Sequence, residues 1–197
     1  MRPGEAAALE RCIAAGGVAL FPADTVYGLA ADPESEEAVD RLYRIKGRPP
    51  RRPAAVMFFA VDDALAALPH LGERTRAALA ELFPGPITAV LPNPDRLYPL
   101  ACADAPERLG VRVPALDAGP RRPVLQSSAN PSGGADARRL EDVDPGIRRQ
   151  VDLELDGGEL PGTPSSVVDL SAYETAGEWR LLREGAFPLA RLREALG

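Results

Sequence analysis

Residues 18–59 have the sequence VALFPADTVYGLAADPESEEAVDRLYRIKGRPPRRPAAVMFF, in which two apolar runs flank a helical pattern. The run VALF predicts a buried strand, and the run AAVMFF predicts a second one. Between them, residues 35–45 predict a helix, because Ser35 can cap its N-terminus and two glutamates follow in the first turn. A strand, a helix and a further strand in succession are typical of an α/β fold.

The rest of the chain continues this alternation. Further helices are expected at residues 4–15, 73–83, 140–150 and 188–196. Further strands are expected at residues 87–91, 109–113, 123–126, 151–155, 166–170 and 179–183. Neighbouring strand candidates near the C-terminus have no helix between them, which argues against a purely parallel sheet. We therefore expect one α/β domain over residues 1–197, with a twisted mixed β-sheet flanked by helices.

The composition argues against several classes of protein. No apolar run approaches the roughly 20 residues that span a bilayer, and Glu5 and Glu10 interrupt the stretch that would be apolar in a signal peptide. Two cysteines, Cys12 and Cys102, are too few for a disulfide framework, and a single histidine rules out a His-rich zinc site. A net charge of −6 argues against a general nucleic-acid coat protein. We expect a cytoplasmic protein without a membrane segment or a metal site of its own.

Lys46 is the only lysine among 23 basic residues. It ends a predicted helix, where any cation favours the helix dipole, so this position explains a charge but not the choice of lysine. Lysine is preferred over arginine where a compact, mobile ammonium must approach a phosphate. Lys46 could therefore be only a helix-end cation, or it could be a functional ammonium near the surface, and both interpretations remain open. Residues 44–52 add four arginines and no acid, which favours a small anionic ligand, and Arg48 could offer it a planar fork.

Two segments rich in small polar residues could also carry chemistry. PADTVYG, residues 22–28, directly follows the first predicted strand, where α/β domains often build sites. SSANPSGG, residues 127–134, offers hydroxyls and backbone N–H groups to an anion, although it lacks the pattern of a nucleotide-binding P-loop. Each segment could equally be a plain turn. Ser165 and Arg183 are weak signals when taken alone.

Seven motifs, in this order and spacing, resemble those of the YrdC-like family, the threonylcarbamoyl-AMP synthases. They are PADTVYGLAADP (22–33), RLYRIKGRP (41–49), PGPITAVL (84–91), GVRVP (110–114), SSANPSG (127–133), SSVVDL (165–170) and LLREGA (181–186). The resemblance implies a YrdC-like α/β domain with a concave cationic site, in the short form without a C-terminal extension domain. It also implies synthesis of threonylcarbamoyl-AMP from L-threonine, bicarbonate and ATP, with release of pyrophosphate.

The resemblance further implies a role for individual side chains. The family's K-x-R pair corresponds to Lys46 and Arg48, which would be catalytic. Its S-x-N pair corresponds to Ser128 and Asn130. The expected ATP ligands are Arg48, Arg52, Arg108, Ser128, Asn130, Arg138 and Arg183. The expected threonine ligands are Thr25, Arg112 and Ser165. Mg²⁺ is expected on the ATP phosphates and not in a protein cage.

Several positions depart from the family pattern, among them Pro164-Ser165-Ser166, where the family usually has E-S-T. Ala23 stands where the family usually has a threonine, and Met57 where longer members often have a histidine that contacts threonine. Arg52 replaces a frequent asparagine, and Arg138 replaces a frequent threonine and could reach a phosphate. These changes affect the expected threonine pocket more than the expected activity.

The resemblance places the reaction as the first step of tRNA threonylcarbamoyladenosine (t6A) formation. Other enzymes would then transfer the group to the adenosine beside the anticodon. Two alternatives remain open. One is an RNA-binding module with weak tRNA affinity, against which the acidic net charge counts. The other is a catalytically silent relative, against which the intact K-x-R and S-x-N pairs count.

Overall fold

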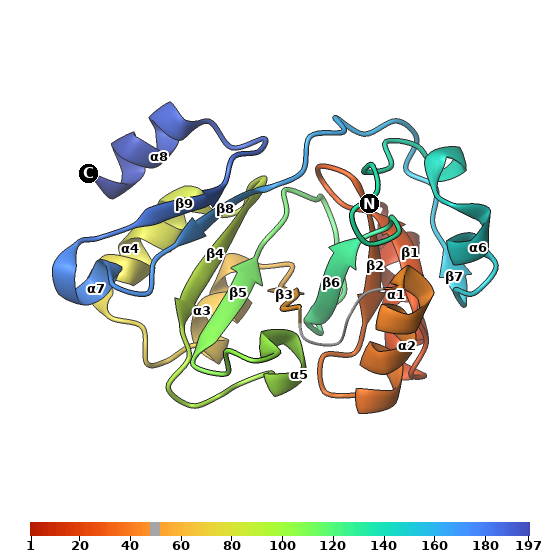
Figure 1. Ribbon diagram of the computed structural model, residues 1–197, viewed down its shortest axis with the longest axis horizontal. Coiled ribbons are helices and arrows are strands. Elements are labelled where there is room, and N and C mark those ends of the chain that lie inside the picture. Colours follow the sequence, from red (N-terminus) through yellow and green to blue (C-terminus); the bar gives the residue numbers. More distant parts are fainter. Residues whose placement is uncertain (48–51) are drawn as a thin grey trace.

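The computed structural model describes residues 1–47 and 52–197. Its strands are β1 (Ala19–Pro22), β2 (Tyr27–Ala31), β3 (Ala55–Met57), β4 (Ile87–Pro92), β5 (Arg108–Arg112), β6 (Val124–Ser128), β7 (Leu153–Glu154), β8 (Ser166–Asp169) and β9 (Arg180–Arg183). Within the described ranges, these nine strands form one sheet in the order β7-β1-β2-β6-β3-β5-β4-β8-β9. Figure 1 shows the sheet from β7 on the right to β9 on the left.

The sheet mixes parallel and antiparallel pairs. β1 and β2 form an antiparallel hairpin, and β8 and β9 pair antiparallel near the C-terminus. β3 and β5, and likewise β4 and β8, pair in parallel across longer connections. The predicted mixed sheet is therefore confirmed.

Helices connect these strands. They are α1 (Pro3–Ala14), α2 (Glu36–Lys46), α3 (Val61–Ala67), α4 (Glu73–Leu82), α5 (Pro99–Cys102), α6 (Pro145–Arg148), α7 (Tyr173–Ala176) and α8 (Leu189–Leu196), with a 3₁₀ turn η1 (Leu140–Asp142). In α2, Ser35 Oγ accepts a hydrogen bond from the Ala38 N–H at 3.3 Å, and Gly47 ends the helix in the left-handed region at φ 58°. In the described part of the chain, no helix has the length and apolar character needed to cross a membrane.

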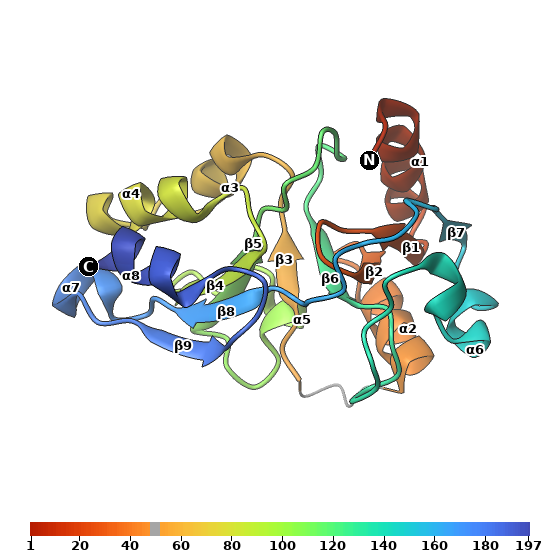
Figure 2. The ribbon, with the colours of Figure 1, turned by 90° about the horizontal axis from the view of Figure 1, so that it is seen from above.

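The two faces of the sheet are covered differently. One face carries the larger apolar cluster, where strand residues such as Val56 and Val111 pack with residues of α2, α3, α4 and α8. The opposite face carries a smaller cluster, in which Leu9 and Ile13 of α1 pack with Phe21 and other residues of β1, β2, β3 and β6. Figure 2 shows α1 and α2 on opposite sides of β1 and β2. Side chains of β3, β5, β4 and β8 on the α1 side of the sheet line a groove beyond this cluster.

The segment PADTVYG is only in part the loop that its composition predicts. Residues Tyr27–Ala31 form β2, which is buried along its whole length, and the turn is confined to residues 23–26. The sequence of this strand, YGLAA, contains small residues that disfavour strands in general. Pairing with β1 on one side and β6 on the other determines its conformation instead.

The single helix predicted over residues 140–150 is wrong. The segment forms η1 and then α6, with a break between them. Asp144 caps α6 by accepting the Gly146 N–H at 2.6 Å, and Pro145 is its first residue. Proline lacks the N–H that would continue a helix from the preceding turn, so the helical pattern is interrupted there.

Candidate active site

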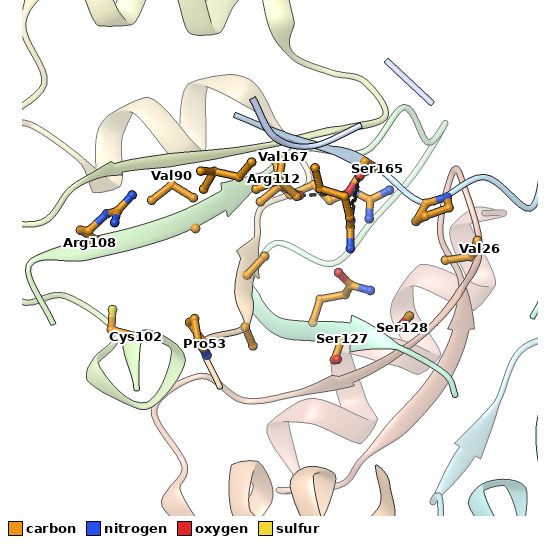
Figure 3. Close-up of a pocket in the computed structure, with 18 of the residues that line it drawn as sticks. Val26, Pro53, Val90, Cys102, Arg108, Arg112, Ser127, Ser128, Ser165 and Val167 are labelled. Atoms are coloured by element: carbon orange, nitrogen blue, oxygen red, sulfur yellow. Dashed lines mark hydrogen bonds between the residues drawn. The ribbon is translucent and has the colours of Figure 1, made fainter. Parts of the chain in front are cut away.

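A groove of about 370 Å³ lies on the face of the sheet that also carries α1. Its floor is made of Ala55, Gly110 and Val90, which pair in one row across β3, β5 and β4. Polar side chains surround this floor, as Figure 3 shows in part, and they include Arg108, Arg112, Gln126, Ser128, Ser165 and Arg183. A cavity of this volume matches those that bind small molecules, which range over roughly 300–1,000 Å³.

Arg112 anchors one end of the groove. Its side chain is 4% exposed and forms an ion pair with Asp24. It also donates a hydrogen bond to Thr25 Oγ1 at 2.7 Å. Asp24 is held in turn by the Ala115 N–H, which lies 3.1 Å from its second oxygen. The turn of the β1–β2 hairpin and the end of β5 therefore build this end together.

Ser165 and Arg183 complete the same end. Arg183 donates to the Ser165 carbonyl oxygen from Nε and Nη2, at 3.1 and 2.7 Å, and to Ser165 Oγ at 3.2 Å. Ser165 Oγ also lies 3.1 Å from Thr88 Oγ1. Arg183, which the family resemblance associates with ATP, thus contacts a predicted threonine ligand.

The charges at this end do not cancel. Burial lowers the pKa of Arg112, the Asp24 carboxylate opposes that change, and the nearby charge of Arg183 adds to the lowering. Two guanidinium groups therefore face one carboxylate. Nε of Arg112 is buried and has no hydrogen-bond partner among residues 1–47 and 52–197. A small anion would match both the excess charge and the open donor.

Lys46 approaches a second end of the groove from α2. Its ammonium donates hydrogen bonds to the Ser128 carbonyl oxygen, to Ser128 Oγ at 3.5 Å and to Asn130 Oδ1 at 3.3 Å. The Ser132 N–H donates to the Lys46 carbonyl oxygen at 3.1 Å. Tertiary contact thus joins the predicted K-x-R and S-x-N segments. Ser128 lines the groove, and Lys46 and Asn130 hold it in place.

The expectation that Lys46 lies near the surface is wrong, since the residue is only 4% exposed. Val39, Leu42 and Lys46 follow one another at helical spacing on the buried side of α2. The side chain of Lys46 therefore points toward the sheet while the chain leaves the helix at Gly47. The spacing from Val39 was an available signal for this burial.

Arg108 and Cys102 line a further part of the groove. Arg108 forms an ion pair with Asp169. Burial favours a raised pKa for Asp169, but the hydrogen bonds from Ser171 and the charge of Arg108 outweigh it and lower the pKa overall. Burial raises the pKa of the Cys102 thiol, whose sulfur lies 3.5 Å from the Asn93 amide. Cys102 therefore stays protonated at neutral pH and is not suited to act as a nucleophile.

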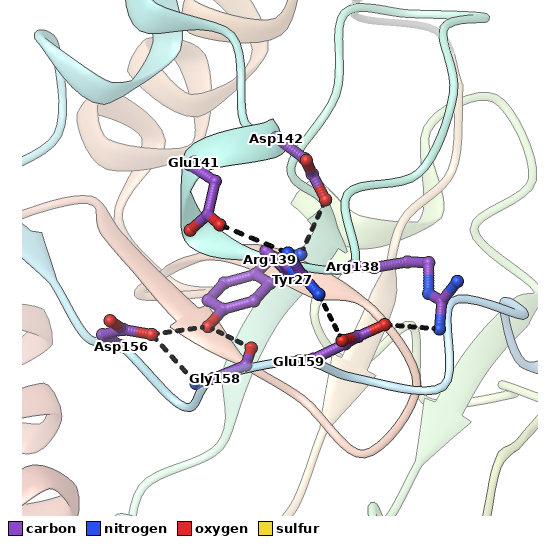
Figure 4. Close-up of polar contacts among 8 residues, drawn as sticks. All are labelled: Tyr27, Arg138, Arg139, Glu141, Asp142, Asp156, Gly158 and Glu159. Carbon is purple, nitrogen blue, oxygen red and sulfur yellow. Dashed lines mark hydrogen bonds and ion pairs between the residues drawn. The ribbon is translucent and has the colours of Figure 1, made fainter.

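Arg138 is held outside the groove lining. Its guanidinium pairs with Glu159 at 2.8 Å, and Arg139 binds the other oxygen of the same carboxylate at 2.6 Å, as Figure 4 shows. Beside them, the hydroxyl of Tyr27 donates to the Gly158 carbonyl oxygen at 2.9 Å. These contacts attach the segment around residues 156–160 to β2. Arg138 remains a predicted ATP ligand without a place in the groove itself.

Two other predicted ATP ligands remain, Arg48 and Arg52. Arg48 lies outside the described residues. Arg52 is exposed, and its carbonyl oxygen accepts a hydrogen bond from the Tyr43 hydroxyl at 3.4 Å. Its neighbour Pro53 lines the groove, so Arg52 stands beside the rim.

Asp24 and Gln126 are site residues that the sequence analysis missed. Asp24 belongs to the segment PADTVYG, which could equally have been a plain turn, and its partner Arg112 lies 88 positions away. Gln126 lies within a predicted strand. Because side chains alternate along a strand, its place between Leu125 and Ser127 was a signal that it faces away from the apolar core.

Ala23 and Met57, two departures from the family pattern, are core residues. They are 1% and 0% exposed and belong to the smaller apolar cluster beneath α1. Their apolar side chains pack with Leu9 and Ile13 of that helix. The cluster explains why these two positions are apolar here.

Comparisons with known proteins fit this arrangement. The family model for the Sua5, YciO and YrdC proteins, described as "Telomere recombination", matches residues 11–185. The chain belongs to the Sua5/YciO/YrdC family. The family resemblance of the sequence motifs is thereby confirmed.

Several members of the Sua5/YciO/YrdC family resemble the chain closely. A threonylcarbamoyl-AMP synthase of Stenotrophomonas maltophilia is 36% identical over 156 residues, which cover 73% of this chain and 81% of the relative. One from Pyrococcus abyssi is 29% identical over 189 residues, covering 92% of this chain and 54% of the relative. The chain thus spans about half the length of that relative. The crystal structure of P. abyssi Sua5 complexed with L-threonine matches with a TM-score of 0.87 and 27% identity, over 100% of this chain and 58% of that one.

Proposed function

We propose that this protein makes threonylcarbamoyl-AMP from L-threonine, bicarbonate and ATP and releases pyrophosphate. The observation that carries the proposal is one groove with two polar ends. Arg112 and Ser165 meet at one end, and Ser128, held by Lys46 and Asn130, lies at the other. The names of the relatives and the threonine complex of P. abyssi Sua5 support these substrates.

The threonine carboxylate would bind at the Arg112 end. The excess positive charge there and the unpartnered Nε of Arg112 suit a carboxylate. The Thr25 hydroxyl accepts a hydrogen bond from Arg112, and the Ser165 hydroxyl accepts one from Arg183. They would bind the amine and hydroxyl groups of threonine.

The reaction needs positioning and charge neutralisation more than a protein nucleophile. The deprotonated threonine nitrogen attacks the carbon of bicarbonate, an N–C bond forms, and water leaves to give a carbamate. A carbamate oxygen then attacks the α-phosphorus of ATP, and the bond to the bridging oxygen breaks to release pyrophosphate. Lys46 and Arg48 would neutralise the charge that develops on the phosphate oxygens.

The remaining polar residues would serve ATP. Ser128 and Asn130 would bind it from the sheet, and Arg108 and Arg183 from the groove walls. Arg52 and Arg138 would reach the phosphates from outside the groove lining, Arg138 after release of Glu159. Mg²⁺ would enter with ATP, coordinated by phosphate oxygens.

The product is a reactive mixed anhydride that a second enzyme must use. Enzymes that modify tRNA would transfer the threonylcarbamoyl group to adenosine, which makes this the first step of t6A formation. We propose a cytoplasmic location on this basis, with residues 1–197 acting as one YrdC-like domain.

Pyrophosphate release should require threonine and bicarbonate together with ATP and Mg²⁺. Serine lacks only the methyl group, a difference of roughly 1–3 kcal/mol in a pocket, so it should be a poorer substrate and not an inert one. A coupled pyrophosphate assay with one amino acid at a time measures this. Equal turnover with every amino acid, or none with threonine, would contradict the assignment.

Gly110→Val should block the groove while leaving the fold intact. A Cβ at Gly110 would have Ala54 O and Ala55 Cα as its nearest neighbours, both at 3.6 Å, which is ordinary contact. The added side chain would stand on the groove floor, and valine suits a strand. We expect turnover to fall at least about tenfold, with the free energy of unfolding changed by less than about 1 kcal/mol.

The assay for Gly110→Val pairs turnover with urea denaturation. Gly4→Val is the matched control, because a Cβ at Gly4 meets nothing within 4 Å and the residue lies in α1, no residue of which lines the groove. Normal turnover in a folded Gly110→Val variant would mean that the substrates bind elsewhere.

A further inference from the structure

Gln126 is a buried polar residue to which neither the K-x-R nor the S-x-N motif assigns a role. It lies in β6, lines the groove and is 7% exposed. Its backbone pairs with β2 and β3, and its carboxamide is open to the groove, since it is not among the enclosed polar atoms that lack a partner. A ligand bound in the groove can therefore form hydrogen bonds with this amide.

The strand register places Gln126 between the two ends of the groove. It pairs with Ala55, which pairs with Gly110, so Gln126 continues the row of residues on the groove floor. Ser128 lies two residues along β6 on one side of this row, and Arg112 lies two residues along β5 on the other. Two residues in a strand span roughly 7 Å. A ligand that reaches from Ser128 to Arg112 must cross the row of Gln126.

The carboxamide itself points along the sheet toward the Ser128 side. Its nitrogen would lie 2.7 Å from a Cβ built on Gly28, the residue that pairs with Ser128. The absence of a side chain at Gly28 makes room for the amide. Gln126 therefore offers N–H donors and a carbonyl acceptor just inside the end that Lys46 supports.

We propose that Gln126 binds the carbamate group that links threonine to the α-phosphate. The proposal rests on the proposed function, in which the carboxylate lies at Arg112 and the phosphates lie toward Lys46. The group between them is the carbamate derived from bicarbonate. The amide of Gln126 would donate a hydrogen bond to a carbamate oxygen and hold the other oxygen free for attack on phosphorus. A neutral amide can donate a hydrogen bond to the carbamate anion. A carboxylate in its place would only accept hydrogen bonds and would repel the anion.

Gln126→Leu tests the assignment, with Gln126→Met as a second variant in case leucine disturbs β6. Both variants replace the amide side chain with an apolar one of similar size. We expect kcat/KM for bicarbonate to fall about 10- to 100-fold, as for the loss of a hydrogen bond to a charged group. The Kd values of threonine and ATP, measured separately by calorimetry, should change less than about threefold. Gln126→Glu should lower the rate further through repulsion.

The chain's other glutamine provides the control. Gln150 is exposed and donates to the Gly146 carbonyl oxygen at 2.7 Å, so Gln150→Leu should leave all constants unchanged. An unchanged kcat/KM for bicarbonate in a folded Gln126 variant would overturn the carbamate assignment alone. Equal losses for bicarbonate, threonine and ATP would overturn it as well, because they indicate a structural role. Absence of threonine- and bicarbonate-dependent turnover in the unmutated protein would overturn the proposed function instead.

Discussion

Lys46→Arg is expected to lower turnover by about 10²–10³-fold. The Lys46 ammonium donates to two oxygens of Ser128 and to Oδ1 of Asn130. A guanidinium is larger, planar and differently directed, so it would displace the positive charge from the reacting phosphate. Arginine preserves the cation at the helix end, so an interpretation of Lys46 as a helix-end charge predicts no loss.

Because Lys46 is buried, Lys46→Arg should also lower the stability of the protein. Forcing a larger side chain into a site that is 4% exposed should destabilise the protein by about 1–3 kcal/mol. Turnover must therefore be measured well below the melting temperature, beside a melting curve for each variant. Arg44→Lys is the control, because Arg44 is exposed in the same last turn of α2 and should tolerate the change. Near-normal turnover of a folded Lys46→Arg variant would remove Lys46 from the catalytic machinery.

Arg112→Ala is expected to weaken threonine binding by at least about 100-fold, while ATP binding changes only slightly. Removing one partner of a buried, hydrogen-bonded charge pair typically costs 2–5 kcal/mol in affinity. The same change leaves the Asp24 carboxylate buried without its guanidinium, which should cost about 3–5 kcal/mol of stability. Calorimetry with each ligand alone, together with urea denaturation, measures the two effects.

Arg112→Lys separates binding from stability. Lysine keeps a positive charge beside Asp24 but loses the planar fork that a carboxylate matches. The variant should fold with most of its stability and still bind threonine at least about tenfold more weakly. Loss of ATP binding with threonine binding intact would reverse the roles given to the two ends of the groove.

The helix α2 shows how far local sequence reasoning reaches. Ser35 and Gly47 mark its ends in the sequence and in the structure, and the scarcity of lysine singles out Lys46. The strand β2 shows the opposite case. Its residues Gly28, Ala30 and Ala31 carry little strand propensity, and pairing with β1 and β6 on both sides imposes the strand.

The two asparagines make the same point about function. The chain contains only these two asparagines, and their scarcity gives no reason to assign a role to one and not to the other. Asn93 holds a loop, with its amide donating to Leu97 and Pro106 carbonyl oxygens at 2.9 Å each. Asn130 contacts Lys46. The S-x-N motif and its order among the other motifs marked Asn130 as a candidate site residue. Its contact with Lys46 could not be derived from the sequence of its own segment.

The sequence by itself determined the α/β class, the family and most of the residues proposed to bind substrates. These depend on local periodicity and on motifs that remain readable along the chain. The tertiary structure alone decided the pairing of Asp24 with Arg112, the burial of Lys46 against Ser128 and the position of Gln126 between them. The physical reason is that each of these depends on strand order and register, which bring together side chains as many as 88 positions apart. When such a contact buries a side chain or balances a charge, neither of the two segments shows this in its own sequence.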